Sequence, residues 1–510
     1  MKKSFNLFIV AVLIATALEA QSTFATKIES LTSLQSDKEL VCNYTSRYIV
    51  SYQHSTNVSG VRHYFIVHDT QNGTVARFPM SAGYNPNGIS QHPTTYYIND
   101  MKVSSDCVCW FCGRKEVLSS TGTFIPGIGW GTQIDNYGFV GKFSLTDVLA
   151  GNGSYNLFTL TTTQELTRIE PRGDYQQVFM VGYPHNCTVD ADGNPIESCL
   201  VGLGYDYSTN KWLHDVVVPV DTTEMFSDLA NTGDGIVVAS RFVGDHYTIG
   251  LRHTKNGPLR DNTNLSWLSN SYKYLTNTAY LYPNSEIVTW RRDTDPLFLS
   301  SDGNGGNLAL SHSCGELPPP VQPPSIPGLN NELPTGLASY KLYVNIPGNV
   351  SITGAYFIST PNYIALKDAS AANSGQKTEL LVDDSTNSQW AIYTFPWNNP
   401  PSSGNIKCFV GKSSYSWQGI AYMGYNPEYT YIAGHNQQGY FSYSAFGSIP
   451  ANGKQCFGWD TFSVNNLHNM QHTSGSTVNL STSDDGEEIV PSSHSFTSTF
   501  LSFQTTCIRY

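Results

Sequence analysis

The chain has 510 residues and a formal net charge of −12, and only 13% of its residues are charged. Such an acidic chain repels a phosphate backbone, and no Lys/Arg cluster with interleaved aromatic residues offsets this, so we expect no nucleic acid partner. Aromatic residues make up 13% of the chain and glycine contributes 43 residues, a composition that favours strands and tight turns over helices.

The first twenty residues have the order of a secretory signal peptide. Two lysines precede an apolar run from Phe5 to Leu18, and small residues follow at Ala20 and Ala25. We expect cleavage after Ala20, so that residues 1–20 are removed, with cleavage after Ala25 as the alternative. No later segment is apolar over a length that spans a bilayer. The sequence predicts an exported protein (periplasmic, on the cell surface or extracellular) that does not span a membrane.

A short pattern of strands recurs along the chain. In residues 41–80, an Asn72-Gly73 pair between two apolar runs is typical of a hairpin turn. In residues 96–145, a strand, a turn at 104–106, a strand at 107–113 ending in glycine and a later strand at 138–145 follow one another. We count eight such units, whose second strands begin near Tyr48, Cys107, Gln177, Ile236, Ile287, Tyr363, Tyr429 and Thr477.

One small sheet cannot bury both of its faces, so repeated sheets are expected to pack on one another. The pattern predicts an all-β fold, a β-propeller of seven blades, with six or eight blades as alternatives. Residues 314–334 are rich in proline and are expected to form a stiff linker or surface excursion. We place propeller blades in residues 41–313 and 335–510. The alternative is that residues 335–510 form a separate β-domain.

Three stretches resemble a known group of proteins. Residues 100–103, 108–113 and 138–143 are similar to the blade of secreted, uncharacterised β-propeller proteins of gut Bacteroidota. The residues 18–21, Leu-Glu-Ala-Gln, also resemble signal cleavage sites in that phylum. The resemblance implies an exported propeller and assigns no catalytic residue.

Ten cysteines in an exported chain make disulfides the default expectation. Cys187 and Cys199 bracket a hairpin turn at 192–194 and are predicted to form one bond. Further candidate pairs are Cys42 with Cys507 and Cys408 with Cys456. On a strand, Cys107 and Cys109 face one way and Cys112 the other, so buried thiols are favoured over a metal cluster.

No spacing of residues indicates a catalytic centre. Residues 482–486 fit the start of an Asp-box, which is a folding turn remote from catalysis. Residues 190–194 have oxygen ligands at alternate positions, as calcium loops do, but for this stretch a plain surface turn is favoured. We therefore name no catalytic residue and expect neither a metal nor a cofactor. Sugar rings stack on exposed tryptophans, but a tryptophan in a strand-rich protein is more often part of the core, and the core position is favoured here. The tryptophans concerned are Trp130, Trp212, Trp267, Trp397 and Trp417.

Two functional hypotheses follow. The first is a non-enzymatic binding protein that recognises a glycan or a protein through loops on one face of the ring. The second is a glycoside hydrolase or lyase whose carboxylates, contributed by different blades, converge at the central channel.

Overall fold

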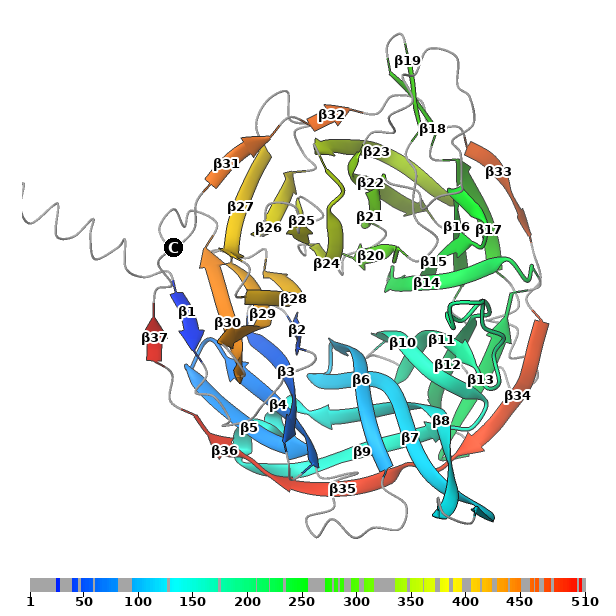
Figure 1. The fold of residues 1–510 in the computed structure, drawn as a ribbon, viewed down its shortest axis with the longest axis vertical. Helices are drawn as coiled ribbons and strands as arrows, with labels where there is room; N and C mark the ends of the chain where they lie inside the picture. The colour runs from blue at the N-terminus through cyan, green and yellow to red at the C-terminus, as the bar shows by residue number, and fades with distance from the viewer. Residues whose placement is uncertain are drawn as a thin grey trace, which may run out of the picture.

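The computed structural model describes residues 24–27, 39–44, 47–57, 60–80, 94–125, 129–172, 176–207, 209–219, 221–232, 235–255, 271–277, 279–282, 285–288, 295–301, 307–315, 335–345, 349–360, 362–371, 377–384, 389–396, 405–412, 415–423, 429–438, 441–450, 459–462, 464–466, 472–477, 481–501 and 504–506. Its strands form seven five-stranded antiparallel sheets, numbered here sheets 1 to 7, and one two-stranded hairpin. Figure 1 shows the sheets arranged around a central axis as the blades of a propeller. The predicted all-β propeller is confirmed.

Each sheet contains one inner strand, three further strands and one strand on the outer rim. Sheet 1 contains β2 (Glu39–Tyr44), β3 (Tyr48–Asn57), β4 (Gly60–Asp69), β5 (Thr74–Met80) and β36 (Thr499–Phe500). Sheet 2 contains β6 (Thr94–Val103), β7 (Val108–Ile125), β8 (Gly129–Ser144), β9 (Asn152–Leu160) and β35 (Ser492–Thr497). Sheet 3 contains β10 (Thr163–Arg172), β11 (Gln177–Pro184), β12 (Cys199–Asp206), β13 (Lys211–Val218) and β34 (Ser481–Ile489).

The other four sheets follow the same plan. Sheet 4 contains β14 (Glu224–Asn231), β15 (Gly235–Phe242), β16 (Asp245–Lys255), β17 (Ser271–Asn277) and β33 (His472–Thr477). Sheet 5 contains β20 (Phe298–Ser301), β21 (Asn307–Cys314), β22 (Thr335–Asn345), β23 (Asn349–Thr360) and β32 (Val464–Asn466). Sheet 6 contains β24 (Ala365–Ala371), β25 (Lys377–Asp384), β26 (Gln389–Pro396), β27 (Asn405–Lys412) and β31 (Trp459–Phe462). Sheet 7 contains β28 (Tyr415–Met423), β29 (Tyr429–Gln438), β30 (Phe441–Pro450), β1 (Phe24–Lys27) and β37 (Gln504–Thr506).

Two elements lie outside this plan. A hairpin of β18 (Ala279–Tyr282) and β19 (Ser285–Val288) lies between sheets 4 and 5 in the chain. The short helix α2 (Leu145–Ala150) follows β8; the Ser144 side chain caps its first turn, and Gly151 ends it in a left-handed conformation. In the described part of the chain, no helix has the length and apolar character needed to cross a membrane.

The core lies between neighbouring sheets. The apolar residues of each strand alternate between two faces, and each face packs on the next blade. Sheets 1 and 2 share a cluster in which Phe65, Phe78, Phe111 and Phe143 contact one another, with ring centroids 4.8–6.1 Å apart. Strand β11 in sheet 3 is buried on both faces, because a blade lies on each side of it. Each sheet is thus stabilised by its two neighbours.

The C-terminal strands form a belt around the ring, defined here as β31 to β37. They add to β27, β23, β17, β13, β9, β5 and β1 in turn, so the belt passes the sheets in the reverse of their chain order. Figure 1 shows the belt, orange to red, on the rim of every blade. The belt pairs with the outer edge of each blade, which would otherwise expose unpaired backbone groups.

The belt corrects two predictions made from the sequence. Residues 467–481 were expected to form an eighth unit, but β33 pairs with β17 of sheet 4, so these residues add to an existing blade. Residues 482–486 were expected to form a turn, but they lie within β34, where the pairing with β13 is irregular. Hydrogen bonding to a distant strand overrides the local turn preference of Asp-Gly.

The middle of the chain also differs from the predicted unit. The expected second strand near Ile287 belongs to the hairpin β18–β19, and sheet 5 begins at β20. The proline-rich segment connects β21 to β22, and these two strands pair with each other from Asn307 to Cys314. The segment therefore joins neighbouring strands of one blade.

Candidate functional site in the central channel

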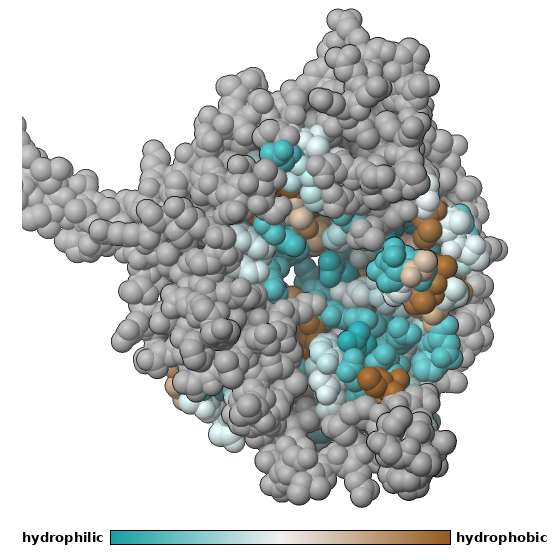
Figure 2. All heavy atoms as spheres, in the orientation of Figure 1, coloured by the Kyte–Doolittle hydropathy of each residue, from teal (hydrophilic) through white to brown (hydrophobic). Residues whose placement is uncertain are grey.

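The inner strands of the seven sheets surround a central channel. Figure 2 shows an opening at the centre of this face with hydrophilic residues around it. The innermost strand of each sheet is an edge strand, because no strand among the described residues pairs with its inner side. Backbone N–H groups on that side need other partners. The side chains that bind them build the site.

Five inner strands carry a β-bulge at an equivalent place. The pairing with the second strand skips one residue, which is Asn99, Thr167, Ser227, Lys367 or Gln418. A bulge leaves one residue unpaired and changes the direction of the side chain that follows it. The residues that follow are Asp100, Arg168, Asp228, Asp368 and Gly419. Four of the five inner strands thus present a charged side chain.

A glycine on the second strand makes room for the bulge in sheets 2 and 3. Gly113 and Gly182 each lie opposite the residue that precedes a bulge. A Cβ atom on Gly113 would lie 1.8 Å from the carbonyl oxygen of Tyr97, and one on Gly182 would lie 2.1 Å from that of Glu165. No side chain fits there, which explains the glycine at this place in the repeated pattern.

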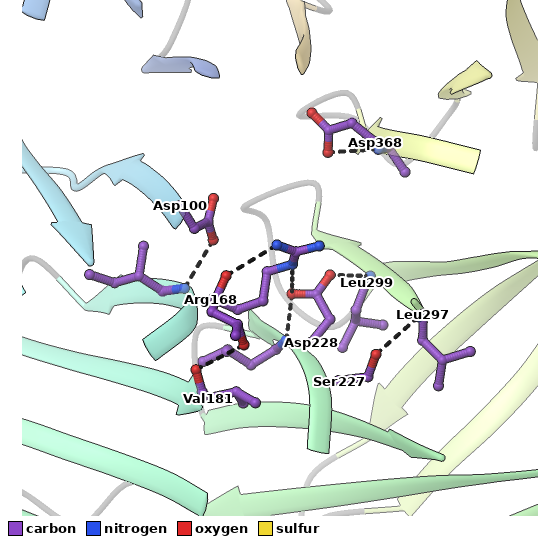
Figure 3. Close-up of polar contacts among 12 residues, drawn as sticks. Asp100, Arg168, Val181, Ser227, Asp228, Leu297, Leu299 and Asp368 are labelled. Carbon is purple, nitrogen blue, oxygen red and sulfur yellow. Dashed lines mark hydrogen bonds and ion pairs between the residues drawn. The ribbon is translucent and has the colours of Figure 1, made fainter. Parts of the chain in front are cut away.

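The three aspartates of the channel make the same pair of hydrogen bonds. One carboxylate oxygen of each accepts from the backbone N–H of the next residue, at 2.8–2.9 Å. The other oxygen accepts from the backbone N–H of the neighbouring sheet's inner strand. For Asp100, Asp228 and Asp368 in turn, these donors are Ile169 at 2.9 Å, Leu299 at 2.7 Å and Ile420 at 2.8 Å. Each aspartate therefore links two adjacent blades. Figure 3 shows the bond from Leu299 to Asp228.

Arg168 occupies the equivalent position in sheet 3. Its Nε lies 3.7 Å from Oδ1 of Asp228, and its guanidinium carbon lies 5.4 Å from the ring centre of Phe298. Figure 3 shows the guanidinium between Asp100 and Asp228, with Asp368 across the channel. Burial alone would lower the pKa of Arg168, but Asp228 and the other aspartates raise it. Arg168 stays positively charged at the centre of the site.

A second layer of charge lies two residues further along β6 and β10. Glu170 accepts a hydrogen bond from the backbone N–H of Asn231 in sheet 4. Burial would lower the pKa of Lys102, but Asp100 and Glu170 raise it overall. We call the six residues Asp100, Lys102, Arg168, Glu170, Asp228 and Asp368 the channel cluster.

Burial weakens the acidity of three carboxyl groups in the channel cluster. It raises the pKa of Asp228 and of Asp368 to about 6, and that of Glu170 to about 7. Arg168 and Lys102 act in the opposite direction but do not cancel the effect of burial. These groups exchange protons near neutral pH, and the cluster offers both hydrogen-bond donors and acceptors.

The structure places the predicted cysteines as follows. Cys187 and Cys199 are both free thiols: Cys199 is buried at the start of β12, and Cys187 donates a hydrogen bond to the carbonyl of Thr188. The bond between them stays a prediction. Cys456 and Cys507 lie outside the described residues, as does the side chain of Cys408. Cys109 and Cys112 pack in different core clusters, on opposite faces of β7, as predicted.

Other predicted sites lie away from the channel. The Asp190 carboxylate accepts hydrogen bonds from the backbone N–H groups of Asp192 and Asn194 at 2.8–2.9 Å, so this loop is a self-bonded turn. Trp417 is fully buried, and Trp212 packs against Trp110 with ring centroids 6.1 Å apart. Trp267, Trp397 and the side chain of Trp130 are outside the described part of the chain. In that part, no three His, Cys, Asp or Glu side chains are grouped as a metal would require.

The channel cluster was not predicted from the sequence, although a signal for it exists. In four inner strands an apolar residue is followed by a polar one, a charged one and another apolar one. These stretches are 98–101, 166–169, 226–229 and 366–369. Two consecutive polar residues break the alternation of a strand and mark the bulge.

No family model and no curated protein matches the chain. Among solved structures, it is similar to the β-propeller domain of the Trilobed protease from Pyrococcus furiosus, with 7% identity, a TM-score of 0.33, and coverage of 88% of this chain and 98% of that one. It is also similar to the NanB sialidase from Streptococcus pneumoniae, with 8% identity, a TM-score of 0.36, and coverage of 84% and 70%. Likenesses this distant do not indicate an activity.

Proposed function

We propose that this protein is an exported binding protein that holds an oligosaccharide in the mouth of its central channel. The observation that supports this proposal is the channel cluster, in which charged side chains from four blades meet around the axis. Five of its six members are partly exposed to solvent, so a ligand can reach them.

The chemistry of the cluster suits hydroxyl groups. A sugar hydroxyl both donates and accepts hydrogen bonds, carboxylates accept them, and Arg168 and Lys102 donate them. Hydrogen bonds to charged groups are about twice as strong as those between neutral groups. The inter-blade bonds of the aspartates hold the acceptors in place before a ligand arrives, which lowers the cost of ordering the site.

A second candidate is a glycoside hydrolase or lyase. The observation in its favour is Glu170, because a carboxyl group with a pKa of about 7 can donate a proton at neutral pH. Against it, every carboxylate of the cluster accepts a backbone hydrogen bond from the next blade, which is a structural role.

An oligosaccharide array tests the proposal. The chain that begins at Gln21 is applied to neutral and acidic oligosaccharides, and its binding to each is measured. We expect Arg168→Met and Lys102→Met to weaken the affinity for the bound sugar by about tenfold or more, since a hydrogen bond to a charged group contributes about 1.5–3 kcal/mol. Lys211→Met is the control, because Lys211 pairs with Glu488 on the outer rim. Retention of no oligosaccharide, or equal affinity in all three variants, would refute the proposal. Release of reducing sugar that is lost in Glu170→Gln would instead assign the hydrolase.

A further inference from the structure

Lys142 on β8 is held between two tryptophans. Its ammonium nitrogen lies 4.3 Å from the ring centre of Trp212 in sheet 3 and 5.0 Å from that of Trp110 in sheet 2. Trp110 is almost fully buried, while Lys142 and Trp212 are partly exposed to solvent. The electron-rich face of an indole ring attracts a cation at such distances. Lys142 is thus a solvent-accessible positive charge where sheets 2 and 3 meet.

Lys142 forms neither a hydrogen bond nor an ion pair with any residue that the structure describes. Asp106, in the turn after β6, attracts the ammonium group, but its carboxylate accepts a hydrogen bond from Ser104 instead. By contrast, Lys211 pairs with the carboxylate of Glu488. A lysine ammonium has three donor hydrogens, so Lys142 can bind an anion that comes from outside the chain.

Lys142 lies at the same level of the ring as Lys102 of the channel cluster. Lys102 is opposite Trp110 on the neighbouring strand, and Trp110 is opposite Lys142, so the three side chains share one face of sheet 2. Two strand spacings separate Lys102 from Lys142, which is about 10 Å between their backbones. An oligosaccharide of a few residues can therefore reach Lys142 from the channel.

Aromatic rings continue beyond Lys142 toward the rim of sheet 3. The ring centre of Tyr205 lies 5.3 Å from that of Trp212 and 5.0 Å from that of Tyr207. Tyr207 is 48% exposed. Exposed aromatic rings offer a surface on which a sugar ring can stack, next to a charge that can hold its acidic group.

We propose that Lys142 binds the carboxylate or sulfate group of an acidic sugar residue, as part of the oligosaccharide that the channel cluster holds. This inference rests on the oligosaccharide binding proposed above and names the class of sugar. At Lys142, the anionic group of the ligand pairs with the ammonium and stays away from the carboxylates of the channel cluster.

The environment of Lys142 favours such a partner. Burial lowers the pKa of Lys142 to about 8, and the attraction of Asp106 only partly offsets this effect. A bound anion favours the charged form of the amine, so it should raise the pKa of Lys142 and make the amine less reactive.

Calorimetry with matched pairs of sugars tests the inference. The probes are trisaccharides with one glucuronic or galacturonic acid residue, the same sugars after reduction of the carboxyl group, and a galactose trisaccharide with and without sulfate. We expect the acidic member of at least one pair to bind about tenfold or more tightly than its neutral form. In Lys142→Met the ratio of the two affinities should fall to about one, and Lys142→Arg, which keeps the charge, should preserve it.

Lys115→Met is the matched control. Lys115 is also a lysine of sheet 2 whose pKa is lowered by burial, but it lies on the other face of β7 and donates a hydrogen bond to Thr159 at 3.3 Å. This variant should keep the preference for the acidic sugar. Equal affinity within every pair, or a preference that survives in Lys142→Met, would overturn this inference and leave oligosaccharide binding standing. Failure of every sugar to bind would refute both.

Chemical labelling provides a second measurement on the natural chain. Limited acetylation with acetic anhydride at pH 8, followed by mass spectrometry of the peptides, reports the reactivity of each lysine. The acidic trisaccharide should slow the acetylation of Lys142 several-fold and leave that of Lys115 unchanged, whereas its neutral form should protect neither. Acetylation of Lys142 at the same rate with a bound acidic sugar would count against contact with its anionic group.

Discussion

At the scale of single residues, the aspartates of the channel accept hydrogen bonds from backbone groups on the inner strands of the ring. The inner strand of each blade has N–H groups with no neighbouring strand, and a carboxylate can accept two of them at once. Asp100, Asp228 and Asp368 do this across three interfaces between blades. Their first role is to hold the ring together, and the ligand chemistry proposed for the channel uses the same groups.

The structural role predicts a loss of stability when an aspartate is removed. In Asp368→Ala, the backbone N–H groups of Ala369 and Ile420 lose their acceptor, at a cost of about 1–3 kcal/mol each. Asp368→Asn keeps one acceptor oxygen and should lose less. Urea unfolding followed by intrinsic fluorescence measures both. The control is Asp192→Ala on an exposed loop, which should change the free energy of unfolding by less than about 0.5 kcal/mol. A loss in Asp192→Ala as large as that in Asp368→Ala would contradict the structural role of Asp368.

The raised pKa of Glu170 predicts how stability depends on pH. Burial raises this pKa from 4.5 to about 7 in the folded chain, so folding favours the neutral carboxyl group. Its contribution is fully present below pH 4.5 and is lost as the pH rises to about 7. Glu170→Gln cannot ionise, so its thermal midpoint relative to the natural chain should rise across this window. Calorimetry from pH 4 to 8 measures the difference, and a difference that does not vary with pH would disprove the prediction.

At the scale of elements, the belt is built from strands that do not resemble a blade. Most are short, and each pairs with a different sheet. The best-defined anchors are Ile489, which lies in the core between sheets 2 and 3, and Phe496, which stacks on Phe78 with ring centroids 4.1 Å apart. The belt is therefore fastened by a few side chains in addition to its backbone hydrogen bonds.

Phe496 and Phe500 form a matched pair for testing this anchoring. Phe496 is 7% exposed, whereas Phe500, four residues later on the same belt, is 56% exposed. Phe→Ala at a buried site typically costs about 3–5 kcal/mol, so Phe496→Ala should release β35 locally. Hydrogen exchange of residues 492–497 should become faster by at least tenfold, while strands β6 to β8 keep their protection. Phe500→Ala should leave the exchange unchanged; equal effects of the two substitutions would count against the anchor.

At the scale of the whole molecule, the ring is closed twice. The N-terminal strand β1 pairs with β30 of the last blade, and the belt then ties the seven outer edges together. Because β1 comes from the N-terminal end and lies between β30 and β37, the outer edge of β30 in the last blade is paired with a strand from the other end of the chain. A cut after Ala25, which the sequence offers as the alternative cleavage site, would divide β1.

A chain that begins at Gln21 should therefore be more stable than one that begins at Ile28. The shorter chain lacks β1, so β30 and β37 lose their shared partner. We expect a lower thermal midpoint and faster proteolysis in β28 to β30 than in β6 to β9. Export with cleavage after Ala20 stays a prediction, which N-terminal sequencing of the mature protein tests by a first residue of Gln21. Equal stability of the two chains would show that β1 does not close the ring.

The sequence alone determined the class of fold and many of its strands. Second strands predicted near Tyr48, Gln177 and Tyr429 begin at those residues, and the Asn72-Gly73 turn joins β4 to β5. These features depend on neighbouring residues, since period-two alternation and hairpin turns are local properties of the chain.

Only the tertiary structure decided which strands pair across the ring and which charges meet in the channel. The sequence predicts that residues 472–477 belong to a hairpin. In the structure they pair with β17, some 200 residues earlier, where they supply hydrogen-bond partners to the backbone at the outer edge of sheet 4. Asp100 and Asp368 stand on strands far apart in the chain, and circular closure places both at one channel. Pairing between distant segments depends on the geometry of the whole ring, and no local pattern of residues specifies that geometry.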